Sequence, residues 1–466
     1  MIFPLPLTPF ERYYLSDDSR QYPTTFPVEL RFAGPLAREP FLHAIEQAVE
    51  RHPLLGALVA RSGLTRKWIA GPREPAWVDW AHCSAPIAHP QGEYIDLAVE
   101  RGMRVWVRAS DESARVLFQL HHSCCDGLAA TQFLDDVLVL YASAVTDPSQ
   151  IPALAPVNVE RLRDRASVDL SGAQPGFRAF VRDIVITLYV WARILFRRVA
   201  IVAAPIPSAQ DPSADSGGDA PRSPEILSFE QYQLTVAEAE AYRQTALRQS
   251  MAQNDLMIRD LMLAIDDWNR RQRATTRAAY RVNVPVNVRG REGADIPASN
   301  RLGFAFVTAS PRDFGDREKL LQIVHAQTEQ IKQWKLALYF LGGLGLATIF
   351  PGAVPASLRW KKSFATVVLS NIGRLMEHSR LPRGEDRLVC GNVILEHITG
   401  APPIRRNTRA ALLVGEYGGR TTISLRCEPR LFSPAETRAL LNTYVARLRE
   451  TAAVETSVER VSPDSI

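Results

Sequence analysis

The sequence predicts a soluble globular protein that combines helices with strands and that divides into two domains. Its 466 residues exceed the length of one ordinary domain. Hydrophobic residues make up 46% of the chain and charged residues 23%, a balance typical of a folded protein and not of a disordered one. Residues 207–224 are small, polar and low in complexity, so they predict a flexible crossover and mark the clearest boundary.

Several periodic segments in the first half predict regular structure. Apolar residues at helical spacing predict a helix over residues 37–49, which must end near Pro53 because the residue before a proline disfavours helical angles. Alternation over residues 103–108 predicts a half-buried strand. A polar turn follows, and the apolar run 115–120 then completes a hairpin. Helical spacing resumes after Gly127.

The segment 177–204 is apolar but carries arginines at regular intervals. On a helix, Arg178, Arg182, Arg193 and Arg197 fall within an arc of about 100°, which leaves a wide apolar face. We expect a long helix packed on the body of the protein. The alternative is a basic amphipathic helix that lies on a membrane or binds an acidic partner.

The second half repeats the mixture of patterns. Helical spacing covers residues 256–268, and strand alternation covers residues 279–288 and 300–307. Pro285 lies inside the first of these strands and predicts an edge or a bulge. A serine, a proline and a glutamate within residues 433–436 form a capping box, which begins the last helix.

Residues 336–358 contain no charged residue and are long enough to suggest a transmembrane segment. Glycines and prolines interrupt the stretch, so we expect instead a buried helix and loop, or a surface hairpin that touches lipid. Its apolarity also suggests a lipidic substrate.

Charge and cysteine usage exclude several classes of protein. A net charge of +5 without a concentrated basic tract gives little support for nucleic-acid binding. The five cysteines lack CxxC spacing, which argues against a disulfide framework or a structural zinc site and for a reducing compartment. The proline-interrupted N-terminus does not resemble a signal peptide. We therefore expect a cytoplasmic protein, with membrane association as an option.

The densest cluster of chemically capable residues is Leu-His-His-Ser-Cys-Cys-Asp-Gly at residues 120–127. His121 and His122 end a predicted strand, and Asp126 and Gly127 turn the chain into a helix. A neutral imidazole at a strand end is well placed to accept a proton from an alcohol or amine near neutral pH. Asp126 also has a purely structural interpretation as the N-cap of that helix.

Two other kinds of site use the same residue types. A metal site is conceivable, although adjacent residues usually cannot both reach one tetrahedral ion. A nucleophile at Cys124 or Cys125, activated by His122, is also conceivable. The simpler interpretation is that the two cysteines are small hydrophobic residues that fill a tight turn. The usual hydrolase, P-loop and dinucleotide motifs lack a supporting context.

The cluster resembles the HHxxxDG signature of the chloramphenicol-acetyltransferase-like superfamily, which includes peptide condensation domains, alcohol acyltransferases, wax ester synthases and mycobacterial polyketide-associated acyltransferases. Further segments resemble the family in its own order along nearly the whole chain. They are Arg-His-Pro-Leu-Leu at 51–55, Val-Pro-Val-Asn-Val-Arg at 284–289, Asn-Arg-Leu-Gly at 300–303, Ser-Asn-Ile-Gly at 370–373, Ile-Ser-Leu-Arg at 423–426 and Leu-Phe-Ser-Pro-Ala-Glu at 431–436. No DFGWG stretch is present, which disfavours the plant branch, and we expect a stand-alone enzyme without an adenylation or carrier domain.

The resemblance implies an α/β (α+β) fold of two similar subdomains with mixed sheets and a channel between them. The N-terminal subdomain would span residues 1–170, the helix and crossover 171–224, and the C-terminal subdomain 225–466. Donor and acceptor would meet in the channel, and the variable residues Cys124 and Cys125 would narrow it.

The resemblance also assigns roles to single residues. It makes His122 the general base, with His121 supporting it. Asp126 becomes a structural residue paired with an arginine, for which we choose Arg289. Backbone N–H groups near Gly127 would stabilise the oxyanion, with the side chain of Asn371 as a weaker candidate.

The resulting hypothesis is an acyltransferase that moves an acyl group from a coenzyme A or carrier-protein thioester to an alcohol, less readily to an amine. The thioester is a co-substrate, and we expect neither a bound cofactor nor a metal. Partners would be the acyl donor, a small-molecule or lipid acceptor, a carrier protein and, as peripheral contact, a membrane; a monomer suffices. The alternatives are a non-catalytic condensation-domain-like protein that binds a carrier protein or lipid, and a hydrolase that releases the acyl group to water.

Overall fold

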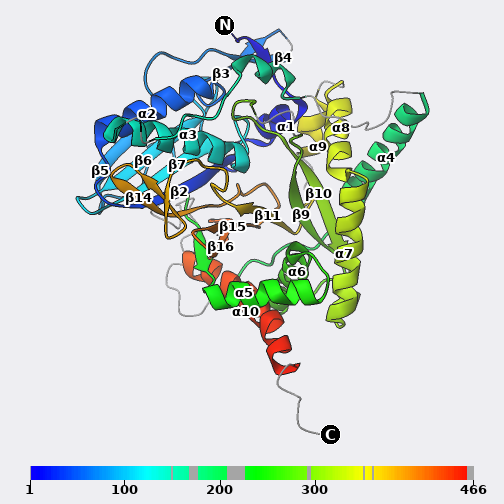
Figure 1. Ribbon diagram of the computed structural model, residues 1–466. Coiled ribbons are helices and arrows are strands. Elements are labelled where there is room, and N and C mark those ends of the chain that lie inside the picture. The colour runs from blue at the N-terminus through cyan, green and yellow to red at the C-terminus, as the bar shows by residue number, and fades with distance from the viewer. Residues whose placement is uncertain are drawn as a thin grey trace.

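The computed structural model describes residues 2–63, 65–147, 149, 151–166, 177–206, 226–290, 295–349, 352–358 and 362–458. The predicted crossover at 207–224 lies outside these residues. The fold is α/β with mixed sheets, as the resemblance implies, and consists of two large sheets that lie side by side with helices packed on them (Figure 1). A small third sheet contains β1 (Leu5–Pro6), β4 (Thr65–Ile69) and β3 (Leu58–Ser62), in that order.

The first large sheet has seven strands. Its order is β12 (Arg383–Gly384), β13 (Arg387–Cys390), β14 (Val393–Gly400), β2 (Thr25–Ala33), β7 (Ser113–His121), β6 (Met103–Ala109) and β5 (Trp77–His82). Two helices, α2 (Arg38–Arg51) and α3 (Gly127–Val145), pack against each other over this sheet (Figure 1). The predicted helix 37–49 therefore exists, and it ends at Arg51, with His52 as its C-cap directly before Pro53.

The second large sheet has six strands. Its order is β10 (Leu302–Ala309), β9 (Tyr280–Asn287), β11 (Val367–Arg374), β15 (Ala410–Tyr417), β16 (Arg420–Cys427) and β8 (Glu230–Gln233). Three helices bury their apolar faces on it: α5 (Val236–Arg248), α6 (Gln253–Arg271) and α10 (Pro434–Val458). The capping box predicted for α10 is present, because Ser433 and Glu436 exchange hydrogen bonds of 2.6 and 3.3 Å through their backbone N–H groups.

Strands β12–β14 come from the second half of the chain but complete the first sheet. β14 pairs antiparallel with β2, with Thr399 opposite Glu29. The second half of the chain therefore contributes strands to the first sheet and also packs on it. Apolar residues of this segment, such as Leu388 and Leu395, belong to the core of the first sheet.

Strand β6 differs from the prediction of a half-buried strand. Arg104, Trp106 and Arg108 lie on its predicted solvent face, yet all three are buried. Residues of the loop before the strand cover this face: Arg104 donates to the carbonyls of Gly92 and Tyr94, at 2.9 and 2.8 Å. An alternating pattern of arginines predicts solvent exposure, whereas here carbonyls and carboxylates satisfy the charges of Arg104 and Arg108 inside the protein.

The uncharged span 336–358 forms two helices, α8 (Leu336–Ile349) and α9 (Ala353–Leu358). α8 packs against α1 (Pro9–Asp17), β10, α7 (Arg317–Gln333) and α4 (Phe177–Phe196). Short 3₁₀ helices cover Val159–Asp164 and Pro311–Asp313. In the described part of the chain, α3 alone is long and apolar enough to cross a membrane by length and composition, and 56% of its apolar window is buried inside the protein.

Candidate active site

The HHxxxDG cluster forms the tight turn between β7 and α3. His121 is the last residue of β7, and Asp126 is the N-cap of α3, with its carboxylate accepting from the Ala129 N–H at 2.9 Å. A side-chain acceptor at this position satisfies a helix donor that would otherwise lack a partner. The turn is thus fixed at both ends, by the sheet and by the helix cap.

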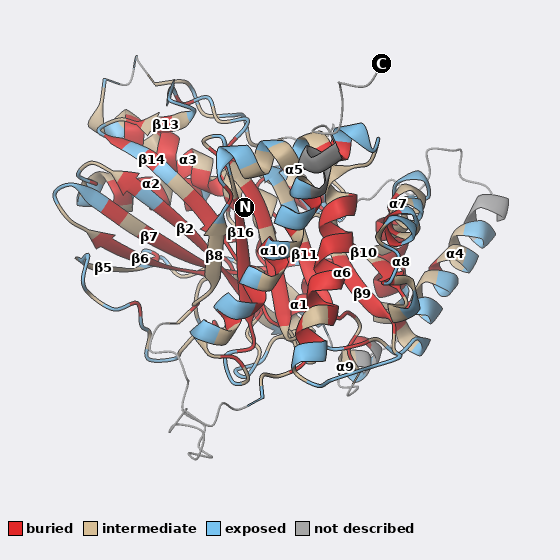
Figure 2. Ribbon diagram, turned by 90° about the horizontal axis from the view of Figure 1, so that it is seen from below, coloured by how far each residue is buried: buried red, intermediate tan, exposed pale blue. Residues whose placement is uncertain are grey.

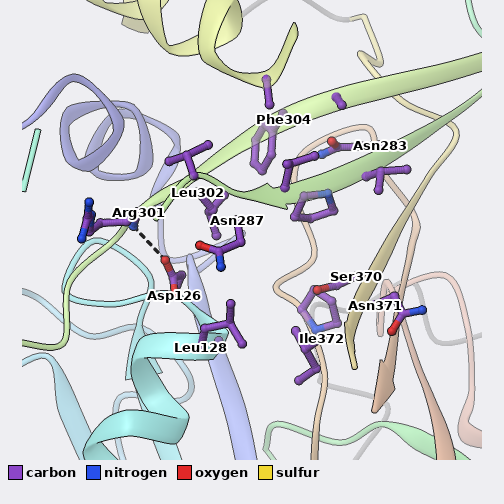
Figure 3. Close-up of a pocket in the computed structure, with 18 of the residues that line it drawn as sticks. Asp126, Leu128, Asn283, Asn287, Arg301, Leu302, Phe304, Ser370, Asn371 and Ile372 are labelled. Atoms are coloured by element: carbon purple, nitrogen blue, oxygen red, sulfur yellow. Dashed lines mark hydrogen bonds between the residues drawn. The ribbon is translucent and has the colours of Figure 1, made fainter. Parts of the chain in front are cut away.

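This turn faces a cavity of about 1260 Å³ between the two sheets. Three residues of the turn line it: His122, Asp126 and Gly127. The hairpin β9–β10 and the Ser370–Gly373 stretch of β11 form further walls, as Figure 3 shows. Much of the lining is aliphatic or aromatic, with Val284, Val286, Ile296, Leu302, Phe304 and Ile331 among its members.

His122 is held as a neutral base at the wall of this cavity. Its ring stacks on Tyr14 with 4.1 Å between centroids, and its Nε2 lies 3.3 Å from the Tyr14 hydroxyl. The Asn300 amide donates to the His122 carbonyl at 2.5 Å and lies 3.4 Å from Nδ1. Burial lowers the pKa of His122 to about 4, against a smaller opposing effect of Asp126. The imidazole is therefore unprotonated at neutral pH and can accept a proton.

Asp126 points away from this base, towards the second half of the chain. Arg289 donates to both of its carboxylate oxygens, at 2.7 and 2.8 Å, and the Arg301 N–H donates at 2.7 Å, the contact drawn in Figure 3. Burial alone would raise the pKa of Asp126, but Arg289 and the two backbone donors outweigh it, so the pKa lies below its ordinary value. The residue thus joins the cap of α3 to the β9–β10 hairpin.

His121 is fully buried and does not line the described cavity. Its Nδ1 accepts from the Ser123 N–H at 3.1 Å, and its Nε2 lies 3.4 Å from an Asp18 carboxylate oxygen. Nδ1 thus binds the backbone of the turn, while Nε2 faces Asp18. His121 therefore shapes the turn that presents His122.

Asn371 and Gly127 line the same cavity in different ways. The Asn371 amide is directed to Asn254 and Met257 at 3.5 and 3.8 Å, and its oxygen accepts from the Gly373 N–H. Figure 3 shows it across the pocket from Asp126. Gly127 needs no glycine-specific backbone angle, and an added Cβ would meet only an Ile372 methyl, at 3.8 Å. Its bare backbone consequently leaves room on the cavity side.

Cys124 and Cys125 do not narrow the channel, contrary to the expectation. Both are fully buried in the first core, and neither belongs to the described lining. The sulfur of Cys124 fills the space beside Gly102, where an added Cβ would approach it to 2.2 Å. Burial raises the pKa of both thiols, so neither supplies a thiolate nucleophile.

All five cysteines are free. Among the described residues, no group of three or more histidine, cysteine or acidic side chains has the geometry to hold a metal ion.

Three residues of the site were missed from the sequence: Tyr14, Asn283 and Asn300. Tyr14 lies on α1, far from the motif in the chain, and no local pattern connects the two. Asn300 was noted only as part of a resembling segment, although it is the residue that bonds the His122 carbonyl. Asn283 lines the cavity with a buried side-chain oxygen that has no hydrogen-bond partner among the described residues.

Comparisons with known proteins identify the fold. No protein-family model matches the chain. An uncharacterized protein of Mycobacterium tuberculosis, Rv2305, is 24% identical over 387 residues, which are 80% of this chain and 83% of that protein.

Many solved structures match this chain, and several of them cover almost its whole length. The epimerization domain of the third module of tyrocidine synthetase B has a TM-score of 0.66 at 15% identity and covers 98% of both chains. TRI3 trichothecene 15-O-acetyltransferase from Fusarium sporotrichioides has a TM-score of 0.68 at 12% identity, over 96% of this chain and 94% of that one. The protein therefore has the chloramphenicol-acetyltransferase-like fold of condensation domains and acyltransferases.

Proposed function

We propose that this protein is an acyltransferase that moves an acyl group from a coenzyme A or carrier-protein thioester to an alcohol. The observation that carries the proposal is His122, a buried and neutral imidazole on the wall of a cavity of about 1260 Å³ between two sheets. The volume exceeds the usual range for a single small ligand and has room for two substrates. The fold shared with an O-acetyltransferase supports the same chemistry.

In the proposed step, Nε2 of His122 accepts the proton of the acceptor hydroxyl as its oxygen attacks the thioester carbonyl. The new C–O bond gives a tetrahedral oxyanion. Collapse of this intermediate breaks the C–S bond, and the departing thiolate takes the proton back from His122. The products are an ester and a free thiol, and the imidazole is regenerated.

The start of α3 supplies the oxyanion donors in this proposal. Gly127 and Leu128 line the cavity at the N-terminus of the helix, whose macrodipole favours negative charge there. Asn371 contributes less, because its amide is directed to Asn254 and Met257.

The acceptor hydroxyl would displace Tyr14 from Nε2, since that hydroxyl lies 3.3 Å away and occupies the same position. The acyl chain would lie against the aliphatic walls that β9 and β10 provide. Asn283 and Asn287 are polar residues on the β9 wall, and the unpaired side-chain oxygen of Asn283 would accept a hydrogen bond from the substrate, since a buried acceptor without a partner costs about 1–3 kcal/mol. A long apolar acyl group that carries a hydrogen-bond donor fits this lining.

The test measures free-thiol release from a panel of acyl-CoA thioesters and from acyl-loaded carrier protein, with pooled alcohols or amines and with none. We expect alcohol-dependent release that falls about 10²–10⁴-fold in His122→Ala. The matched control is His43→Ala, because His43 is exposed on α2.

Other results would contradict the proposal in distinct ways. Release that needs no acceptor would make the protein a hydrolase. Release that survives His122→Ala would remove this residue from the role of base. No release from either donor would favour the non-catalytic binding protein.

A further inference from the structure

Helix α4 exposes an apolar stripe at the edge of the molecule. Figure 1 shows it beside α8, and Figure 2 shows exposed residues along its length. One face is packed: Ile194 is buried, and Trp191 stacks on Phe340 with 5.1 Å between ring centroids. The exposed stripe follows helical spacing and consists of Val181, Val185, Leu188, Ala192 and Phe196. With Leu188 60% and Phe196 77% exposed, this face lacks the burial expected of such side chains.

Arginines flank the stripe without balancing carboxylates. The helix and the residues directly after it contain five arginines and a single acidic residue, Asp183, which pairs with Arg182. In the described part of the chain, Arg193, Arg197 and Arg198 have no ion-pair partner. Arg193 bonds the Tyr189 hydroxyl at 2.8 Å.

Positive charge also lies beneath the helix. Arg281 is buried there and donates to the carbonyls of Arg193 and Ile194, at 2.8 and 3.2 Å. Burial, with the neighbouring Arg197 and Arg193, lowers its pKa to about 10. The region therefore carries uncompensated positive charge both beside and under an apolar face.

A small cavity of about 60 Å³ lies between this helix and one wall of the candidate active site. Tyr189 and Arg193 of α4 line it on one side. Phe304, Ala305 and Ile331 line it on the other, and these three also line the large cavity. The stripe thus lies on the outer side of the wall that encloses the acyl-binding region.

We propose that α4 is a membrane-docking helix that lies flat on an anionic lipid surface. Its stripe would enter the boundary between headgroups and acyl chains, while the arginines extend to phosphate groups. The stripe from Val181 to Phe196 is about 22 Å long at the rise of an α-helix, long enough for a stable in-plane contact.

Two other occupants fit these observations less well. A second copy of the chain would bring the arginines of two α4 helices together, with only Asp183 to offset them. A protein partner with acidic groups would need a complementary shape and specific hydrogen bonds, whereas none of the five side chains of the stripe can form a hydrogen bond. A fluid lipid surface requires neither.

The test is flotation of the full-length protein with vesicles of phosphatidylcholine, with and without phosphatidylglycerol. We expect binding to the anionic vesicles that weakens with salt, and little binding to the neutral ones. Leu188→Ser should lower partitioning about tenfold, because it removes one large side chain from the stripe. Joint replacement of Arg197 and Arg198 by alanine should lower it roughly 30-fold, at about 1 kcal/mol for each charge.

Leu247→Ser is the matched control, because Leu247 on α5 is 59% exposed and Leu188 is 60% exposed. The proposal is overturned if the wild-type protein does not bind anionic vesicles, or if Leu188→Ser and Leu247→Ser bind equally to them. Sedimentation as a dimer that Leu188→Ser dissociates would assign the stripe to a second copy. If the protein bound poly-glutamate and not vesicles, and if this binding depended on the arginines but not on Leu188, the stripe would be assigned to an acidic protein partner.

Vesicle binding needs no turnover, so its failure leaves the proposed chemistry untouched. Leu188→Ser should also retain thiol release from soluble acyl-CoA in the absence of vesicles.

Discussion

The ion pair between Asp126 and Arg289 should stabilise the contact between the two sheets, and its loss should appear first as a loss of stability. Asp126 is 1% exposed and accepts from Arg289, from the Arg301 N–H and from the Ala129 N–H. Breaking one partner of such a buried pair costs about 3–5 kcal/mol. Loss of the α3 cap is included in this sum and contributes about 1 kcal/mol.

We therefore expect Asp126→Ala to lower the free energy of unfolding in urea by about 3–5 kcal/mol. Arg289→Ala should cost a similar amount, because it leaves the carboxylate buried with only backbone donors. The double variant should cost much less than the sum, since each single change removes the same interaction. Arg163→Ala, which removes a surface pair with Glu160, is the control and should change little.

The competing interpretation is that Asp126 orients His122 during catalysis. That role predicts a different pattern: Asp126→Asn would abolish turnover while the unfolding curve stays at its wild-type midpoint. Full stability in the single variants, or strictly additive losses in the double variant, would refute a stabilising role of the Asp126–Arg289 ion pair. The structure favours the stabilising role, because the Asp126 carboxylate accepts hydrogen bonds from Arg289 and Arg301, which belong to the second half of the chain.

Three further predictions concern the base and its surroundings. With the pKa of His122 at about 4, kcat/KM should stay level as pH falls from 7 to about 5 and then decline, so an inflection near 6.5 would contradict the buried neutral base. Asn300→Ala should lower kcat about tenfold with little change in KM and no shift of the pH profile, because it removes a hydrogen bond to the His122 carbonyl. An equal loss in kcat and rise in KM would instead indicate that Asn300 contacts the substrate. Gly127→Ala should leave thermal unfolding unchanged but reduce turnover, since the added methyl has room in the protein and projects towards the cavity; unchanged kinetics would exclude this wall from substrate contact.

The same histidine should also make stability depend on pH. In the unfolded chain it titrates near 6.5, whereas in the folded protein its pKa is about 4. Between these values the unfolded state binds a proton that the folded state does not, so stability falls as pH is lowered from 6.5 to 4. The full effect is about 3 kcal/mol and should be absent from His122→Gln, as urea unfolding at several pH values can show.

The local parts of the site could be predicted from sequence because each depends on neighbours in the chain. The strand, the two histidines, the capping aspartate and the helix follow one another within residues 113–145, and the structure has them in that order. The same holds for α2, which ends before Pro53. It also holds for β9, because its pairing with β11 covers only Val282 and Asn283 and Pro285 lies beyond it, where β9 has no strand partner on that side among the described residues. Short-range rules of capping, periodicity and proline geometry suffice for such features.

Features that depend on distant segments could not be predicted in this way. Nothing near residues 383–400 indicates that this segment joins the sheet of the first half, because pairing between remote strands leaves no periodic signal. The burial of Arg104 and Arg108 depends on a loop that folds over them, so an alternating pattern alone gave the wrong exposure. Tyr14 reaches His122 across 108 residues of sequence for the same reason.

The spacing between His122 and Asp126 explains why one short motif can serve both halves of the protein. A single tight turn places the imidazole at the end of β7 and the carboxylate at the first turn of α3, so the two side chains leave the turn in different directions. The carboxylate then binds Arg289 and the Arg301 N–H, which border the same hairpin that walls the cavity. The cavity is consequently complete only when the second half docks on the turn. Substitutions at Asp126 should therefore impair substrate binding and folding together, whereas substitutions at His122 should remove turnover from a protein that still folds.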